Sequence, residues 1–204
     1  MHDTRHHMFY GRRVSAHEVQ VASAEMAHAV KVLRAGPHDT LLVTDGEGGL
    51  FEVTPGKRTA HETTCRIVRC ETRPRPVPSV TLWVGIPERG PFEQLLSEVV
   101  PLGVSRLVPV VCRYCQQRWW KEWSRHEGRF IRKMVAALKQ SLGVWLPQLC
   151  APVPLCEALE TRGGALLVAH PDGAAAGRVL HDLGPQSRID CLVGPPGGFS
   201  QEEL

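Results

Sequence analysis

The sequence predicts a chain in two parts, a small β-barrel followed by an α/β unit with a parallel sheet. A proline- and arginine-rich segment, Thr72–Ser79, interrupts the chain, since clustered prolines continue neither a helix nor a central strand. Before it, short runs alternate with turn clusters. After it, near-continuous apolar runs alternate with amphipathic segments. We therefore expect a β-rich domain over residues 1–73, a linker over 74–79 and an α/β domain over 80–204.

The first part, residues 1–73, contains patterns typical of strands, turns and one helix. Strand-like runs cover residues 40–56 and 62–72, and the turn Asp45–Gly49 divides the first run into a hairpin. An amphipathic segment over residues 23–36 predicts a helix, with Ser23 as a possible N-cap. The apolar residues of that helix recur at helical spacing: Met26, Val30 and Leu33.

The second part alternates apolar strands with helices, which predicts an open sheet with right-handed crossovers. The predicted strands lie within residues 79–87, 106–112, 164–171 and 188–196. The predicted helices lie within residues 91–103, 121–143 and 174–184. In the longest helix one face collects Phe130, Met134, Ala137, Leu138 and Leu142.

Composition bounds the function without choosing it. A net charge of +3 and a pI near 8.5 permit a nucleic-acid partner but do not argue strongly for one. No apolar run reaches the length of a membrane span, and residues 1–13 lack the apolar core of a signal peptide. We therefore expect a cytoplasmic protein.

The seven cysteines are odd in number and scattered, which indicates reduced thiols. Cys112 and Cys115 form a C-x-x-C pattern that could be half of a zinc site or a redox pair. No second C-x-x-C pattern supplies further ligands, so coincidence is the favoured interpretation and we expect no metal.

Two unusual loops follow strands of the predicted sheet, where open α/β sheets bind ligands. One is His170–Gly173, and the other is Gly194–Gly198, "GPPGG". Glycines let the backbone approach a ligand closely, although many α/β proteins need such a turn for packing alone. Ser200 and Glu203 form a capping-box pattern, so a helix should begin there. No Gly-Lys-Ser/Thr follows, so the loop is not a P-loop.

The loop and its context resemble a known family. "VGPPGGFSQEEL" (193–204) resembles the "GPEGGFS-x-x-E" signature of the RsmE-type methyltransferases of the SPOUT superfamily, and "HAVKVLR" (28–34) resembles their "HH-x-x-x-VLR". Similar residues recur in order along nearly the whole chain: "FYGRRV" (9–14), "DGEGG" (45–49), "LGVSRLVPVVCRY" (102–114) and "AALKQSLGVWLPQL" (136–149).

The resemblance implies a PUA-like RNA-binding barrel followed by a SPOUT-type α/β trefoil-knot domain, acting as a homodimer. It implies S-adenosylmethionine-dependent methylation of uracil N3 in small-subunit (16S) ribosomal RNA. The implied cofactor-binding residues come from two strand ends: Ala169, His170, Val193, Gly194, Pro195, Gly197, Gly198 and Phe199. The implied RNA-binding residues are His28, Lys31, Arg34, Lys139 and Gln140. Generic helix charges explain several of these equally well, and no catalytic residue can be named.

The chain also departs from the family pattern. Pro196 stands where the signature has Glu, Lys139 where many members have Glu, and Gly143 where Arg is common. Ser97 and Pro101 replace the usual Lys and Glu of "QK-x-x-ELGV". The family's "LG-x-x-ILR-x-ETA" segment does not follow the loop, so we expect a truncated chain with an incomplete knot. A non-catalytic RNA-binding relative, or a methyltransferase of a different RNA, are the alternatives.

The segment 116–129, "QQRWWKEWSRHEGR", interleaves tryptophans with basic residues. That composition suits stacking on bases. The alternative is a helix start whose tryptophans anchor it to the core, and this second interpretation is the favoured one.

Overall fold

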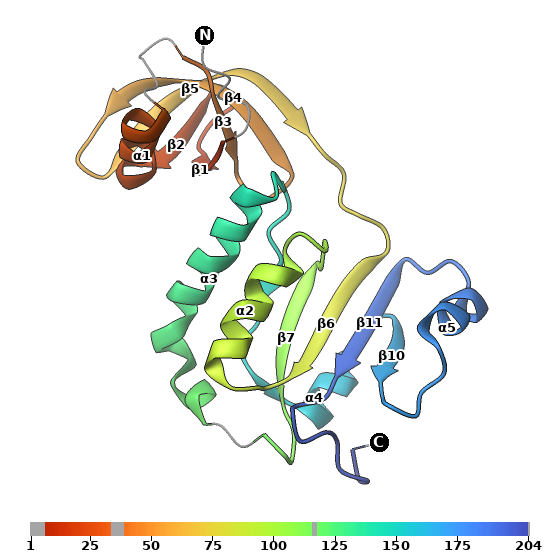
Figure 1. Cartoon of the computed structure of the whole chain (residues 1–204). Coiled ribbons are helices and arrows are strands. Elements are labelled where there is room, and N and C mark those ends of the chain that lie inside the picture. The colour runs from red at the N-terminus through yellow and green to blue at the C-terminus, as the bar shows by residue number, and fades with distance from the viewer. Residues whose placement is uncertain (1–6, 34–38, 116–117, 204) are drawn as a thin grey trace. The chain divides into compact units, whose positions relative to one another are not determined.

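The computed structural model describes residues 7–33, 39–115 and 118–203 (Figure 1). Contacts divide the chain into two compact units. The first contains the chain through Arg75 together with Val135–Leu146, and the second contains Pro76–Met134 together with Pro147–Leu204. Among the described residues, no helix is long and apolar enough to cross a membrane.

The first unit is a closed barrel, as predicted. Its strands, in spatial order, are β1 (Met8–Arg13), β2 (Glu18–Ala22), β5 (Glu62–Thr72), β4 (Gly49–Arg58) and β3 (Leu41–Thr44). Neighbouring strands run antiparallel, and the barrel closes through parallel pairing of β1 with β3. Inward-facing residues alternate along each strand and fill the interior, among them Val19, Val21, Val43, Phe51 and Val53.

The turn between β3 and β4 forms the hairpin that the sequence predicts. The Asp45 carboxylate accepts hydrogen bonds from the backbone N–H groups of Glu47 and Gly49, at 2.8 and 2.9 Å. Gly46 and Gly48 adopt φ values of 75° and 98°, which only glycine tolerates easily. Helix α1 (Ser23–Leu33) follows β2, and it begins at Ser23, whose hydroxyl donates to the Thr59 carbonyl.

The second unit is a parallel α/β sheet, which confirms the predicted fold class. Its strand order is β10 (Ala165–Ala169), β11 (Arg188–Val193), β6 (Ser79–Gly85), β7 (Arg106–Val111) and β8 (Gln148–Leu149), with β9 (Val153–Pro154) also paired to β7. All of these pairings are parallel. The carboxyl ends of β10, β11, β6 and β7 therefore meet at one edge, where the chain leaves each strand in a loop (Figure 1).

The remaining helices are α2 (Arg89–Val99), α3 (Trp123–Gln140), α4 (Leu155–Glu160) and α5 (Ala176–Leu183), with a 3₁₀ turn η2 (Trp119–Glu122) before α3. Helices α2, α3 and α5 lie where amphipathic patterns predict them, whereas the short α4 was not predicted. Four of the five residues predicted for the buried face of α3 are buried: Phe130, Met134, Ala137 and Leu138. The prediction for Leu142 is wrong. The helix ends at Gln140, and Leu142 has φ of 54° and is 39% exposed.

An aromatic cluster holds the start of α3 against α2. Phe92 lies 5.1 Å from Trp119, 6.0 Å from Trp123 and 5.3 Å from Phe130, measured between ring centroids. Such tilted and edge-to-face pairs add to the energy of apolar burial. For Trp119 and Trp123 this packing confirms the interpretation as core anchors rather than as platforms for bases.

Candidate functional site

The loop after β11 is a tight turn whose glycines are required by packing. The Gly198 N–H donates to the Pro195 carbonyl at 2.8 Å, and Gly198 has φ of 75°. The ring of Phe199 folds back under Gly194, where an added Cβ would lie 3.0 Å from a ring carbon. A Cβ at Gly194 would therefore press on the Phe199 ring, and a side chain at Gly198 would strain the backbone.

The same turn is pressed against the ends of two neighbouring strands. A Cβ at Gly85, the last residue of β6, would collide with the backbone of Pro195. A Cβ at Gly197 would lie 2.9 Å from Cβ of Tyr114, in the loop after β7. The loops after β11, β6 and β7 are thus held together through close backbone contact.

A pocket of about 320 Å³ opens between these loops. Its walls come from the loop after β6 and the start of α2, from the loop after β7 and from the glycine turn: Ile86, Pro87, Glu88, Pro91, Tyr114, Pro196 and Gly197. The lining is mainly apolar, with one carboxylate at Glu88. This volume and chemistry suit part of a small ligand bound at the carboxyl edge of the sheet.

The structure brings the predicted cofactor residues to this edge. Val193, Gly194, Pro195, Gly197, Gly198 and Phe199 form the turn, and Ala169 pairs in register with Val193. His170 follows Ala169, and its Nδ1 accepts a hydrogen bond from the backbone N–H of Asp172 at 3.2 Å. Of this set only Gly197 lines the pocket directly.

The wall formed by Ile86, Pro87, Glu88, Pro91 and Tyr114 was not predicted. A signal for it exists, because "GIPERG" follows an apolar strand as the other two loops do. Parallel strands end at a common edge, so a third strand end belongs with the first two.

The C-x-x-C pair lies in the loop after β7, on either side of Tyr114. The Cys112 N–H donates to Sγ of Cys115 at 3.2 Å. A hydrogen bond from the Cys112 thiol lowers the pKa of Cys115 to about 6 against the effect of burial, whereas the same hydrogen bond and burial both raise the pKa of Cys112. No group of three or more His, Cys, Asp or Glu residues that could hold a metal occurs among the described residues.

Glu203 joins the loop after β7 to the end of the glycine turn. Its carboxylate accepts hydrogen bonds from the backbone N–H groups of Arg113 at 2.7 Å and Ser200 at 2.8 Å. Burial raises the pKa of Glu203, but these bonds outweigh it and lower the value. One of the two hydrogen bonds of the predicted capping box therefore forms, the one from the Ser200 N–H to the Glu203 carboxylate. Gln201–Glu203 are a turn, and the helix expected from Ser200 is not seen within the described residues.

Asp190 fixes the register of the strands that carry the two loops. Buried in β11, it accepts hydrogen bonds from Trp83 Nε1 at 3.1 Å and from the N–H groups of Gly163 and Gly164 at 3.0 and 2.8 Å. Burial alone would raise the pKa of Asp190, but these donors lower it. One ionised carboxylate therefore ties β11 to β6 and to the chain entering β10.

Of the predicted RNA-binding residues, Lys139 and Gln140 lie in the barrel unit. They line a pocket of about 480 Å³ with His7, Met8, Phe9, Glu25 and Ala136. The Lys139 ammonium forms an ion pair with the Glu25 carboxylate, so part of its charge is already neutralised. Arg34 and the side chains of His28 and Lys31 lie outside the described residues.

The α/β unit thus combines a parallel sheet with a clamped glycine turn and a pocket at the carboxyl edge, the edge at which open α/β sheets bind ligands. Residues 73–204 match the family model described as an RNA methyltransferase domain, so the chain belongs to that family. The resemblance inferred from the sequence motifs is thereby confirmed.

Similar proteins carry one recurring name. The chain is 26% identical over 192 residues to ribosomal RNA small subunit methyltransferase E of a Synechocystis species, covering 91% of this chain and 62% of that protein. It is 24% identical to the protein of the same name from Rickettsia conorii, covering 92% and 76%. The chain thus spans less than two thirds of the Synechocystis relative.

The solved structure of ribosomal RNA small subunit methyltransferase E from Neisseria gonorrhoeae, bound to S-adenosyl methionine, matches with a TM-score of 0.80. The match has 22% identity and covers 97% of this chain and 82% of that one. It supports the fold.

Proposed function

We propose that this protein is an S-adenosylmethionine-dependent methyltransferase that modifies N3 of a uridine in small-subunit ribosomal RNA. The observation that carries the proposal is the glycine turn Gly194–Gly198, clamped against Gly85 and Tyr114 beside a pocket. It lies within the region that matches the RNA methyltransferase family. Both relatives reported above are named for the small ribosomal subunit. A homodimer, a cytoplasmic location and the knotted path of the chain belong to the same proposal.

The residues present fit the cofactor. Glycines at the turn leave backbone where side chains would otherwise fill the space, and Ile86, Pro91 and Tyr114 offer an apolar wall. The Glu88 carboxylate can accept hydrogen bonds from hydroxyl or ammonium groups. Bound there, S-adenosylmethionine would supply a methyl group that is electrophilic because it is bonded to the sulfonium sulfur.

The protein's own contribution is positioning. Uracil N3 carries a weakly acidic proton that must leave before or during methylation, and the nitrogen must align with the methyl group. Holding reactants in line supplies a large share of such a rate acceleration. The uracil must also leave its stacked or paired state, as bases do in other base-modifying enzymes. The closely packed loops at three strand ends provide a surface on which this alignment can take place.

The cofactor site is tested with a matched pair of glycine substitutions. Gly197→Ala places a Cβ against Tyr114, whereas Gly177→Ala, in α5, meets nothing within 4 Å. We expect Gly197→Ala to weaken S-adenosylmethionine binding about tenfold or more, a loss of about 1.4 kcal/mol. Gly177→Ala should bind as the wild type does. Isothermal titration calorimetry measures both, and equal affinities would contradict the assigned loop.

The substrate is tested by mapping 3-methyluridine in ribosomal RNA from a deletion strain. Loss of one modified position in the small subunit, restored by the wild-type gene, is the expected result. An unchanged map from a protein that binds S-adenosylmethionine would favour a different RNA. A protein that binds RNA but gives no heat with millimolar S-adenosylmethionine would be the non-catalytic relative.

A further inference from the structure

The net positive charge of this chain is concentrated in one segment. Residues 118–133 contain six Lys or Arg and two Glu, a net charge of +4, whereas the whole chain carries +3. The rest of the protein is therefore close to neutral. This segment forms η2 and most of α3.

The cations of α3 lie on the side of the helix away from the aromatic cluster. Arg125, Arg129, Arg132 and Lys133 fall within an arc of about 100° when successive residues turn by about 100°. Phe130 and Met134, which are fully buried, lie about 110° and 150° around the helix from the centre of this arc. The row from Arg125 to Lys133 extends about 12 Å along the helix axis. Burial of the apolar side therefore presents the cationic side outward.

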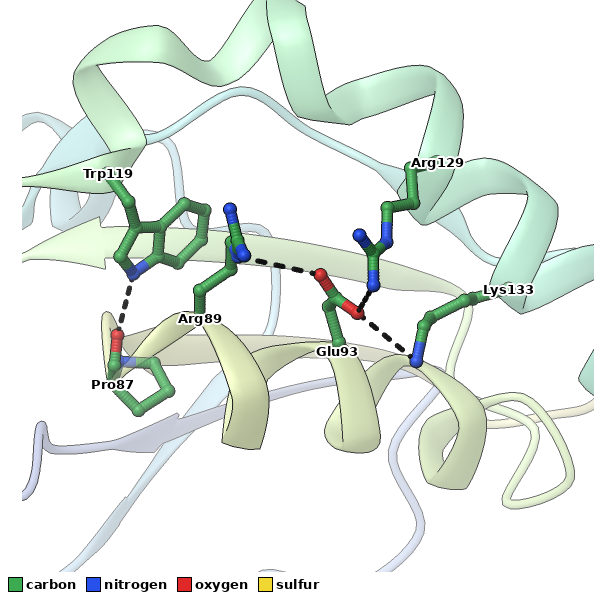
Figure 2. A network of polar contacts seen from close by, with 6 residues as sticks. All are labelled: Pro87, Arg89, Glu93, Trp119, Arg129 and Lys133. Carbon is green, nitrogen blue, oxygen red and sulfur yellow. Dashed lines mark hydrogen bonds and ion pairs between the residues drawn. The ribbon is translucent and has the colours of Figure 1, made fainter.

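A buried carboxylate on α2 orders part of this row (Figure 2). Glu93, with its side chain only 8% exposed, pairs with Arg129 at 2.9 Å, Lys133 at 3.2 Å and Arg89 at 3.7 Å. One carboxylate cannot neutralise these cations, so the cluster keeps a net positive charge. The Arg129 side chain is 55% exposed and uses one of its several N–H donors on Glu93 among the described contacts. Glu93 thus holds the cations in place while leaving donors directed to solvent.

The cationic cluster is joined to the pocket at the carboxyl edge of the sheet. Trp119 Nε1 donates to the carbonyl of Pro87 at 3.0 Å, and Pro87 lines the pocket (Figure 2). Arg89 stands two residues further, in the first turn of α2. Besides Glu93, the carboxylates nearby are Glu122, which pairs with Arg125 at 2.8 Å, Glu127 on α3, and Glu88 at the pocket. The positive surface therefore begins at the pocket rim and continues along α3.

We propose that Arg89, Arg125, Arg129, Arg132 and Lys133 form a phosphate-binding surface that holds the RNA strand flanking the target uridine. The inference rests on the proposed function and adds to it the face of the α/β unit that contacts the RNA backbone. Arginine guanidinium groups match phosphate oxygens with paired N–H donors, and arginine supplies four of the five cations. Phosphate contacts fix the position of a nucleic acid without reading its sequence.

The test removes exposed charges that have no buried partner. In the double variant Arg125→Gln/Arg132→Gln, Glu93 keeps Arg89, Arg129 and Lys133, so the fold is spared. The matched control, Arg162→Gln/Arg178→Gln, removes the same charge from exposed positions at the end of α4 and on α5. Fluorescence anisotropy with a small-subunit ribosomal RNA transcript, repeated over a salt series, gives affinity and salt dependence. Calorimetry with S-adenosylmethionine reports the cofactor site separately.

We expect the α3 variant to bind the transcript about tenfold or more weakly and to bind S-adenosylmethionine normally. Losing two phosphate contacts should reduce the slope of log K against log salt by about 1.4 to 1.8. The control should match the wild type in both. Circular dichroism confirms that each variant is folded, and Lys133→Gln provides an independent member of the row that should weaken binding in the same way.

Three results separate failure of this inference from failure of the proposed function. If wild-type protein methylates the transcript and the α3 variant keeps both affinity and salt slope, the surface is not a phosphate site. The same conclusion follows if the variant loses binding to polyglutamate but not to RNA, which would indicate an acidic protein partner. If the wild type binds neither S-adenosylmethionine nor the transcript, the proposed function fails and this inference fails with it.

Discussion

Within the α/β unit, the β6–β7 side and the β10–β11 side are stabilised differently. On the first, Phe92, Phe130 and Trp123 are buried in one aromatic cluster around α2 and α3. On the second, none of the described residues of α5 is buried, and Leu180 is 47% exposed. The glycine turn follows β11, the strand between β10 and β6. Its position therefore depends on the aromatic cluster on one flank and, on the other, on the contacts of Asp190 together with the packing of Leu166 and Leu192.

The largest expected effect separates the two sides by stability. Phe130→Ala should cost about 3–5 kcal/mol of unfolding free energy, because it leaves a cavity inside the aromatic cluster. Leu180→Ala on α5 should change the free energy by about 0.5 kcal/mol or less, since much of that side chain is already in water. Urea unfolding followed by circular dichroism measures both.

Similar costs for the two substitutions would break the comparison. A large loss at Leu180 would mean that α5 is packed in solution against something that buries it. A small loss at Phe130 would mean that the cluster can collapse into the space that the ring leaves. The unfolding slope m should stay constant in both variants, so that the midpoint reports stability alone.

The second prediction concerns the polar contacts of the β10–β11 side. Asp190→Asn should cost about 1–3 kcal/mol, because in either orientation an amide NH₂ would face a donor, the Trp83 Nε1–H or the N–H groups of Gly163 and Gly164. The folded-state pKa of Asp190 lies below its unfolded value. The carboxylate therefore stabilises the fold above the unfolded pKa, and that contribution is lost as pH falls through the folded pKa.

Thermal unfolding across a pH series checks this sign. The wild type should lose stability toward acid, and Asp190→Asn should show a flatter acid limb. Asp172→Asn is the matched control, because its side chain is 93% exposed in the loop after β10. An Asp190→Asn profile parallel to the wild type would show that the carboxylate does not titrate with folding.

Elements with a regular apolar pattern could be predicted from the sequence. Elements that are too short for a pattern, or that depend on polar contacts, could not. Continuous apolar runs predicted β6, β7, β10 and β11, and glycines with a hydrophobic context predicted the turn after β11. The two-residue strands β8 and β9 and the short α4 carry no usable period. Asp190 looked unremarkable inside "RIDCLVG", because its partner Trp83 is distant in sequence and only the paired strands bring them together.

The sequence predicted only part of the candidate site. Motif resemblance identified the residues of the turn, yet most of the pocket wall comes from the loops after β6 and β7. The role of Glu93 could not be predicted either. A glutamate within an amphipathic helix is usually solvated, and its burial depends on Arg129 and Lys133 arriving from another helix.

The third and smallest effect is a difference in reactivity between two cysteines, one on the β6–β7 side of the sheet and one on the β10–β11 side. The hydrogen bond from Cys112 lowers the pKa of Cys115, after β7, to about 6, whereas burial raises the pKa of Cys191 in β11. Thiolates are the reactive form, so iodoacetamide at pH 7 should modify Cys115 faster than Cys191. Peptide mass spectrometry after timed alkylation measures each site.

The pH dependence of that alkylation sharpens the comparison. Modification of Cys115 should rise through a midpoint near pH 6, because the thiolate population grows as pH passes its pKa of about 6. Cys112→Ala removes the thiol that donates to Cys115, so the midpoint should move toward the ordinary cysteine value of about 8.5. A midpoint unchanged by Cys112→Ala would show that the neighbouring thiol does not stabilise the thiolate. The Cys112 N–H, which also donates to Sγ of Cys115 and survives the substitution, would then be its main support.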